Sequence, residues 1–388
     1  MDGGERFPLL IDRRLGVPDP SATRYAVSRL RSHSISTGLK ALSAIGLFYE
    51  WAEDAAIDTN ERFGSGNLFD TDEVSSLADN LRLSKRRRLE IDGHDLPAPV
   101  LGETHANRVR YVADYIKWRG QRTIQAIPVA NPRVAPTADR LKSVLDQLLK
   151  LSTGGGGRVR LGLTAAQQAR LFEIAKPGSG ENPFHPETQH RNFVLLLLYF
   201  ELGLRKAEPL VLNGSDVVTS DPSLPRIIVE PRPDDPQDPR RIPALVKTAG
   251  RVLPLSPLLA RALDHYILQV RRLIPNSKRT PYVFLETEAG RPMSLAAVYD
   301  VFRVLRGRFP ETFSCSFSTL VMRHTFNDRF KAQAKALSLG DGDQRTIGNY
   351  VMGWSKPSTQ GANYGRRETE ESAQRVLLAL QRKMLDVI

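Results

Sequence analysis

The sequence is poor in cysteine and has no long apolar run. Its 388 residues include one cysteine, Cys315, which permits no internal disulfide and cannot by itself build a thiolate metal site. We expect Cys315 to be a small buried hydrophobe. The longest apolar run, residues 193–200, is far shorter than the roughly 20 residues that a membrane-spanning helix needs. The N-terminal segment mixes acidic and basic residues where a signal peptide needs an apolar stretch, so we expect a cytoplasmic protein without membrane spans.

What the chain has in excess is positive charge. The net charge is +12 and the pI is near 9.9, while 41% of the residues are hydrophobic and 25% are charged. That balance excludes disorder of the whole chain and indicates a globular protein with full cores. Basicity of this size favours a nucleic-acid partner, although ribosome-associated and membrane-surface proteins are equally basic.

Helical periodicity and loop-forming residues divide the chain into four parts. We expect an N-terminal arm or extension over residues 1–33, a helical domain over 34–135, a linker with a helix and a glycine run over 136–160, and a second domain over 161–388. The glycine run 154–157 lacks a following Gly-Lys-Ser/Thr, which favours a flexible linker over a phosphate-binding loop. Predicted helices cover residues 22–32, 36–55, 71–83, 104–120, 138–151, 257–273, 294–306, 318–337, 344–352 and 368–385.

The second domain is expected to be mainly α with a small antiparallel sheet. Two alternating segments between residues 226 and 255 predict strands around a turn at Ala249-Gly250. Lys247 would then lie at an exposed hairpin. The segment 219–241, rich in proline and aspartate, is predicted to be a surface insertion.

Basic residues gather at two places in the first domain. The Lys85-Arg86-Arg87-Arg88 tetrad is either a solvated turn or a patch that contacts phosphates, and the sequence favours neither. The helix 104–120 alternates cations with apolar residues, so one face can pack while the other meets a DNA backbone. Its candidate DNA-binding residues are Arg108, Arg110, Lys117 and Arg119.

The second domain contains residues suited to phosphodiester chemistry. Arg205 follows the apolar run 193–200, and a buried arginine needs either a structural partner such as Glu208 or an anionic ligand. Arg323 lies in a second apolar helix, and Tyr364 comes late in the chain. Two guanidiniums can hold both non-bridging oxygens of a phosphate, a tyrosine can attack phosphorus, and Lys247 can protonate the departing 5′-oxygen. This chemistry requires no metal, and the sequence has no HExxH, CxxC or acidic loop that would hold one.

The order of the motifs GLRxxE, Lys-Thr, MRHTF, Gly-Trp and tyrosine resembles the catalytic domain of the tyrosine recombinases, also called phage integrases. Residues 36–52 and 103–118 are similar to helices of the family's core-binding domain, so the resemblance covers residues 34 to 385. It implies a helical core-binding domain followed by an α+β catalytic domain. Carried over by position, the catalytic residues are Arg205, Arg323, Lys247, Tyr364 and Trp354, the last at a place where many members have histidine.

Three features depart from the family pattern: Leu320, the interval from Gly353 to Tyr364, and the interval from Arg205 to Lys247, which the insertion 219–241 lengthens. Leu320 stands where a histidine that handles the tyrosine proton is usual, and His324 matches a position that is usually structural. The interval from Gly353 to Tyr364 is one residue longer than is common, which leaves Tyr350 as a competing nucleophile. Tyr350 precedes Gly353-Trp354 and suits a buried helix position better.

The resemblance implies that the protein cuts and rejoins double-stranded DNA through a 3′-phosphotyrosyl intermediate, without a cofactor. It implies a homotetramer on paired sites, a monomer as one option in free solution, and accessory DNA-bending or directionality proteins as further partners. Integration, excision and resolution of a mobile genetic element are equally open, and the protein would associate with the nucleoid when bound. The C-terminal helix 368–385 is expected to dock on a neighbouring protomer, with packing on its own domain as the alternative.

Two other functions compete with recombination. One is a non-catalytic DNA-binding relative of the same fold, suggested by Leu320 and by the longer interval before Tyr364. The other is a type IB topoisomerase or telomere resolvase, which would share the chemistry but relax supercoils or form hairpins. Retention of both arginines, Lys247 and a tyrosine favours the recombinase.

Overall fold

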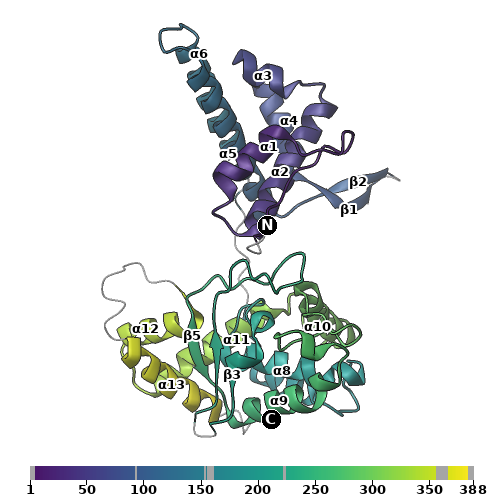
Figure 1. Cartoon of the computed structure of the whole chain (residues 1–388), viewed down its shortest axis with the longest axis vertical. Helices are drawn as coiled ribbons and strands as arrows, with labels where there is room; N and C mark the ends of the chain where they lie inside the picture. The colour runs from purple at the N-terminus through teal and green to yellow at the C-terminus, as the bar shows by residue number, and fades with distance from the viewer. Residues whose placement is uncertain are drawn as a thin grey trace. The chain divides into compact units, whose positions relative to one another are not determined.

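A computed structural model describes residues 5–91, 94–152, 154, 161–221, 224–354 and 366–382, with the side chains of residues 85–96 and 366–370 left aside. The chain forms two compact units, residues 6–158 and residues 159–388 (Figure 1). The described chain is mainly helical with two small antiparallel sheets, which confirms the predicted fold class at that level. No helix among the described residues is long and apolar enough to cross a membrane.

The N-terminal unit is a helical bundle with one β-hairpin. Polar side chains fix where its helices begin: Ser34 accepts a hydrogen bond from the backbone of Thr37, and Asp70 forms a capping box with Glu73. The caps place the first long helix one residue earlier than its periodicity indicates. The elements are α1 (Pro20–Tyr25), α2 (Ile35–Asp54), α3 (Thr59–Ser65), α4 (Thr71–Arg82), β1 (Leu83–Ile91), β2 (His94–Pro99), α5 (Gly102–Ala126) and α6 (Val134–Lys150).

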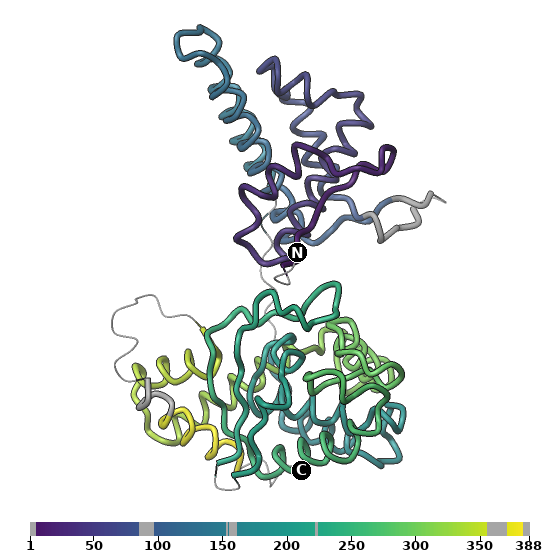
Figure 2. Tube along the Cα trace, viewed as in Figure 1, coloured from purple at the N-terminus to yellow at the C-terminus, as the bar shows by residue number. Residues whose placement is uncertain are grey.

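Aromatic side chains fill the core of this unit. Phe48 of α2 contacts Phe69 and Tyr115 edge-on, and Tyr25 of α1 packs against Tyr115 as well. Buried side chains of residues 22–30 in the segment before α2, purple in Figure 2, belong to this core, so this part of the predicted N-terminal arm or extension packs in the bundle. Helix α6 likewise buries three apolar side chains in this core, so the helix assigned to a linker is a bundle member; these residues are Leu141, Val144 and Leu148.

The basic tetrad lies on a β-strand. Residues 85–88 fall within β1, which pairs antiparallel with β2 down to Ile91 opposite His94. Of the two alternatives for this tetrad, the solvated turn is therefore wrong, and the phosphate-contacting patch stays a prediction. An Asp-Gly pair stands between these two residues in the sequence, and Asp-Gly is a strong hairpin signal that the emphasis on charge overlooked. The ribbon of β1 and β2 extends away from the helices of its own unit (Figure 1).

The C-terminal unit is built around one buried helix. Twelve of the residues of α8 (Pro186–Leu202) are buried, and α9 (Pro257–His265) and α11 (Thr319–Ala336) pack against it. A helix that is apolar on all sides is stable only where other elements cover it completely. The remaining helices are α7 (Ala165–Ala175), α10 (Leu295–Arg308), α12 (Asp341–Met352) and α13 (Arg366–Arg382).

A three-stranded antiparallel sheet in the order β3-β4-β5 completes this unit. Its strands are β3 (Val217–Val218), β4 (Arg226–Val229) and β5 (Arg251–Pro254), and Ile227 of β4 lies opposite Leu253 of β5. The segment predicted to be a surface insertion thus contains a strand whose Ile227 and Val229 are fully buried. Residues 244–250 are not a strand, so Lys247 lies in a long irregular connection before β5 and not in the predicted hairpin.

Helix α13 packs on its own unit. Val376, Leu377 and Leu380 are buried in the core, and Gln381 donates a hydrogen bond to the carbonyl of Pro254 at 3.1 Å. Helix α13 lies beside α12, α11 and β5 (Figures 1 and 2). In this structure the C-terminal helix therefore packs intramolecularly, as the alternative had it. Cys315 is exposed, so the expectation of a buried cysteine was wrong.

Candidate functional site

The site begins where α8 ends. Gly203 adopts a left-handed conformation with φ of 59°, and a Cβ at this position would lie 2.3 Å from the Phe326 ring. Only glycine satisfies both the backbone angle and the contact. The chain therefore turns sharply out of the buried helix, and Arg205 reaches the edge of the core with about a third of its side chain exposed.

Arg205 is held loosely by Glu208. Its backbone N–H donates to Glu208 Oε2 at 2.8 Å, while its Nη1 lies 3.5 Å from Glu208 Oε1. Nη1 also donates to the carbonyl of Met352 at 2.9 Å. Nε and Nη2 of Arg205 have no acceptor among the described residues, so this guanidinium keeps donors for a ligand.

Arg323 approaches the same point from α11. Its Nη1 donates to the carbonyl of Gly203 at 2.6 Å, and its Nη2 donates to the carbonyl of Met352 at 2.8 Å. Burial, with repulsion from Arg205, lowers the pKa of Arg323 to about 10. The group therefore stays charged at neutral pH, and it would bind an anion strongly because its positive charge is poorly solvated.

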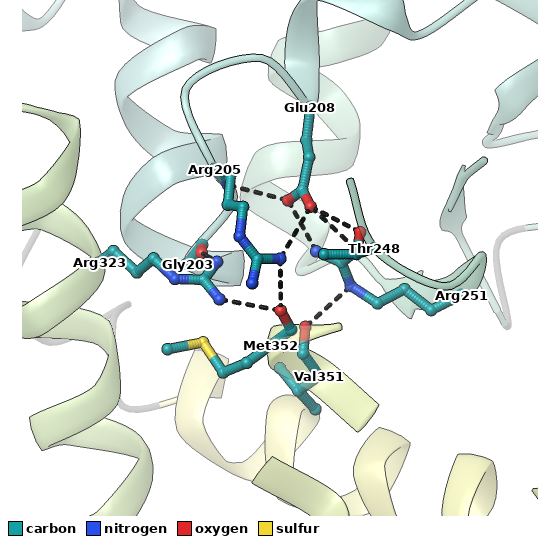
Figure 3. Close-up of polar contacts among 8 residues, drawn as sticks. All are labelled: Gly203, Arg205, Glu208, Thr248, Arg251, Arg323, Val351 and Met352. Carbon is teal, nitrogen blue, oxygen red and sulfur yellow. Dashed lines mark hydrogen bonds and ion pairs between the residues drawn. The ribbon is translucent and has the colours of Figure 1, made fainter. Parts of the chain in front are cut away.

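A single carbonyl brings the two arginines together. The Met352 oxygen at the C-terminal end of α12 accepts from Arg205 and from Arg323, as Figure 3 shows. Cations are favoured at a helix C-terminus, where the last carbonyls have no partner within the helix. The sequence prediction that these residues act together is consistent with this geometry, which forms a candidate oxyanion site.

Glu208 is the buried centre of the surrounding network. Its carboxylate is about 1% exposed and accepts from Thr248 Oγ1 at 3.1 Å and from both terminal nitrogens of Arg251, at 3.2 and 2.7 Å. Burial alone would raise its pKa, but the charge and hydrogen bonds of Arg251 and the backbone N–H of Arg205 outweigh burial and lower the pKa. Glu208 is therefore an anion, not a proton donor.

Arg251 was not predicted from the sequence to be a residue of this site. It lies in a strand-like pattern, and its partner Glu208 is far away along the chain, so local periodicity gives no sign of the pair. An arginine between apolar residues in a predicted strand was the one available signal. The segment from Lys247 to Arg251 thus supplies both an exposed lysine and a buried arginine.

Trp354 borders the arginine pair, and Lys247 precedes a residue of the Glu208 network. Lys247 is exposed and directly precedes Thr248, whose hydroxyl is bonded to Glu208. The ring of Trp354 is 5.9 Å from the guanidinium carbon of Arg323, and Trp354 is 47% exposed. The Trp354 side chain can therefore approach a ligand held by the arginine pair, while a role for Lys247 stays a prediction.

The remaining candidates have more limited roles in the described structure. Leu320 is 40% exposed in the first turn of α11, one turn before Arg323, and has no group that could accept a proton. His324 is half-buried on the same helix. Tyr350 donates its hydroxyl to the carbonyl of Val252 at 3.1 Å, which fits the structural role predicted for it. Tyr364 lies outside the described residues.

The four cations of α5 predicted to bind DNA fall into two classes. Arg108 Nη1 donates to the carbonyls of Leu81 and Leu83, and Arg119 donates to Asn60 and covers the Phe63 ring at 4.2 Å. Arg110 and Lys117 are exposed and stand seven residues apart, on one face of the helix. That exposed pair remains the stronger candidate for DNA contact; the side chains of Lys85, Arg86, Arg87 and Arg88 lie outside the described set.

Comparisons with known proteins give only distant similarity. No protein-family model and no curated protein matches the sequence. Solved structures similar to the chain include the XerH site-specific recombinase bound to difH substrate in a pre-cleavage complex, at 12% identity and TM-score 0.41, covering 93% of this chain and 98% of that one. A post-cleavage complex of XerH with palindromic difH gives 11% identity and TM-score 0.38, covering 89% and 92%. The functional proposal therefore rests on the site.

No three histidine, cysteine, aspartate or glutamate side chains gather as a possible metal site in the part of the chain that the structure describes. The arginine pair is a cationic centre suited to an anion.

Proposed function

We propose that the protein is a DNA strand transferase of the tyrosine recombinase type, which cleaves and rejoins double-stranded DNA at specific sites. The observation that supports this most is the shared Met352 carbonyl, which aligns Arg205 and Arg323. The same helix end leads toward Tyr364, twelve residues later. An oxyanion clamp close in sequence to a tyrosine suits attack on a phosphodiester.

In the proposed reaction each group has one role. Arg205 and Arg323 hold the non-bridging phosphate oxygens and stabilise the charge that grows on them. The hydroxyl oxygen of Tyr364 forms a bond to phosphorus, its proton leaves to water, and the bond from phosphorus to the 5′-oxygen breaks. Lys247 gives a proton to that oxygen, leaving a 3′-phosphotyrosyl enzyme and a free 5′-hydroxyl. Attack by a 5′-hydroxyl from another strand reverses these steps, and Trp354 packs beside the phosphate.

DNA binding would use the surface of both units. The exposed face of α5 with Arg110 and Lys117, and the basic tetrad of β1, are the proposed phosphate contacts. Such contacts make affinity fall with rising salt because each one releases counterions. Recombination of two sites would require a homotetramer, with accessory DNA-bending or directionality proteins as further partners.

The test is covalent trapping on DNA. Duplexes that the full-length protein enriches from a random pool are footprinted and remade with a nick beside each candidate phosphate, so that cleavage releases a short fragment and cannot reverse. We expect a covalent protein–DNA band on a denaturing gel for the wild type and for Tyr350→Phe, and none for Tyr364→Phe.

The alternatives predict different results in the same assay. Tight, footprinted binding without a covalent band at any nick position would favour a non-catalytic DNA-binding protein, for which Leu320 is the structural hint. Relaxation of a supercoiled plasmid that lacks the enriched site would favour a type IB topoisomerase. Loss of the band in Tyr350→Phe with retention in Tyr364→Phe would reassign the nucleophile.

A further inference from the structure

We infer that Arg251 is a positioning residue for the Arg205–Arg323 oxyanion site: by occupying Glu208 and the end of α12, it keeps the Arg205 guanidinium available to an anion. This rests on the proposed function only in taking that anion to be a DNA phosphate. Arg251 itself, with a side chain about 1% exposed, cannot touch a ligand.

The first step of the argument is how fully Arg251 is engaged. Its Nη1 and Nη2 donate to the two oxygens of Glu208 at 3.2 and 2.7 Å, and its Nε donates to the carbonyl of Val351 at 2.8 Å. Nη1 also donates to Thr248 Oγ1 at 3.1 Å. A bidentate guanidinium–carboxylate pair of this kind is among the strongest and most directional in proteins.

The second step concerns how weakly Glu208 can bind Arg205 while Arg251 is in place. Glu208 Oε1 is 3.5 Å from Arg205 Nη1, at the limit of hydrogen bonding, but 3.2 Å or less from Arg251 and Thr248. Figure 3 shows Glu208 between the two arginines. Without Arg251, the buried carboxylate would have one cation left within reach, and we expect it to draw the Arg205 side chain into a close ion pair.

The third step concerns the end of α12. The consecutive carbonyls of Val351 and Met352 accept from Arg251 and from the Arg205–Arg323 pair respectively. At Gly353, with φ of 61°, a Cβ would lie 2.8 Å from Arg251 Nη1. The helix end is thus packed directly on Arg251, and the acceptor that aligns the oxyanion site cannot shift while Arg251 stays in place.

These contacts explain why arginine stands at this position. A lysine has a single ammonium, which could pair with Glu208 or approach the Val351 carbonyl but could not form both sets of bonds in the observed geometry. The fork of the guanidinium is what joins the carboxylate to the helix end.

The experiment measures oxyanion binding by the full-length protein through Trp354 fluorescence, using tungstate as the probe. Trp354 lies beside Arg323, and subtracting the signal of Trp354→Phe removes the other two tryptophans. We expect Arg251→Met to bind tungstate about tenfold more weakly than the wild type. Arg251→Met combined with Glu208→Gln should recover affinity to within about threefold, because no carboxylate is left to capture Arg205.

A matched control separates positioning from a loss of packing. Arg240 is also buried in the C-terminal unit, pairs with Asp238 at 2.8 Å and donates to the carbonyls of Leu210 and Met293, but contacts neither Glu208 nor α12. Arg240→Met should leave tungstate affinity unchanged even where it lowers the melting temperature. If Arg251→Met fails to fold, Arg251→Lys supplies the test, with an intermediate loss of affinity expected.

Each outcome is decisive. Wild-type affinity in Arg251→Met, an equal loss in Arg240→Met, or no recovery in the double variant would overturn the inference, as would a wild type that does not bind tungstate. Covalent trapping is scored separately. A wild type that binds tungstate with the expected variant pattern but never forms a covalent DNA complex would refute strand transfer and leave the positioning role of Arg251 standing.

Discussion

The two units differ in what they bury. Among the described residues, the core of the N-terminal unit contains no buried lysine, arginine, aspartate or glutamate, and its cations lie at the surface or partly covered. The C-terminal unit buries four arginines and four acids; these are Arg191, Arg240, Arg251 and Arg323, with Glu201, Glu208, Asp216 and Asp238. Burial of charge is costly unless it is paired.

The buried arginines of the C-terminal unit differ in whether a carboxylate neutralises them. Arg240 and Arg251 each pair with a buried carboxylate, and both also donate to backbone carbonyls. Arg323 has only carbonyl acceptors among the described residues and is adjacent to a second cation, Arg205. The closeness of two incompletely neutralised guanidiniums is what suits this point of the core to a ligand with negative charge.

The largest expected effect comes from breaking the buried ion pair. Glu208→Ala leaves the charge of Arg251 uncompensated, and loss of one partner of a buried pair costs about 3–5 kcal/mol. Amide hydrogen exchange should show weaker protection in α8 and β5, with α2 and α5 of the N-terminal unit unchanged. Glu311→Ala, at an exposed position of the same unit, is the control. Equal loss of protection in both units would contradict the conclusion that this ion pair stabilises the C-terminal unit alone.

The next effect concerns catalysis. Arg205→Ala and Arg323→Ala each remove one cation from the proposed oxyanion site, and loss of one such stabilising group lowers a rate by about 10²–10³-fold. Single-turnover trapping on saturating DNA should show this loss, with the affinity for DNA changed far less. A slower reaction that is fully restored by more DNA would indicate that the arginines serve binding alone.

More of the fold than of the site could be predicted from the sequence. The helix predicted over residues 71–83 is α4, Thr71–Arg82, because amphipathic spacing and a capping box are local signals. The site depends on partners that have no local signal. The Met352 oxygen is a backbone atom, which any residue would supply, and the pairing of Arg251 with Glu208 exists only in the folded chain.

Among the described residues, Glu201 is a buried acid whose two carboxylate oxygens accept no hydrogen bond. Burial raises its pKa to about 7, against smaller lowering effects of Ser256 and Arg329. The unfolded chain ionises near the ordinary pKa of 4.5 while the folded chain stays protonated, so wild-type stability falls as pH rises from there to about 7.

The substitution Glu201→Gln removes this loss of stability at higher pH, because the glutamine side chain does not ionise. The variant should match the wild type near pH 4.5 and exceed its free energy of unfolding by up to about 3 kcal/mol at pH 8, since each unit of pKa shift corresponds to about 1.4 kcal/mol. Chemical denaturation followed by circular dichroism at both pH values measures the difference, with Glu311→Gln as the exposed control. A stability gain that is the same at both pH values would show that repacking, not ionisation, is responsible.

The smallest effects should distinguish the cations of α5. Arg110→Ala and Lys117→Ala should each weaken duplex binding and reduce the slope of log affinity against log salt by about 0.9, because each removes one phosphate contact. Arg108→Ala is the matched control: its guanidinium is bound to the carbonyls of Leu81 and Leu83, so the slope should stay unchanged even if α4 loses stability. Fluorescence anisotropy between 50 and 200 mM salt measures all three variants. A reduced slope for Arg108→Ala but not for Arg110→Ala would place the DNA on another face of the helix. Arg108 would then contact a phosphate although its guanidinium is bound to backbone carbonyls in this structure.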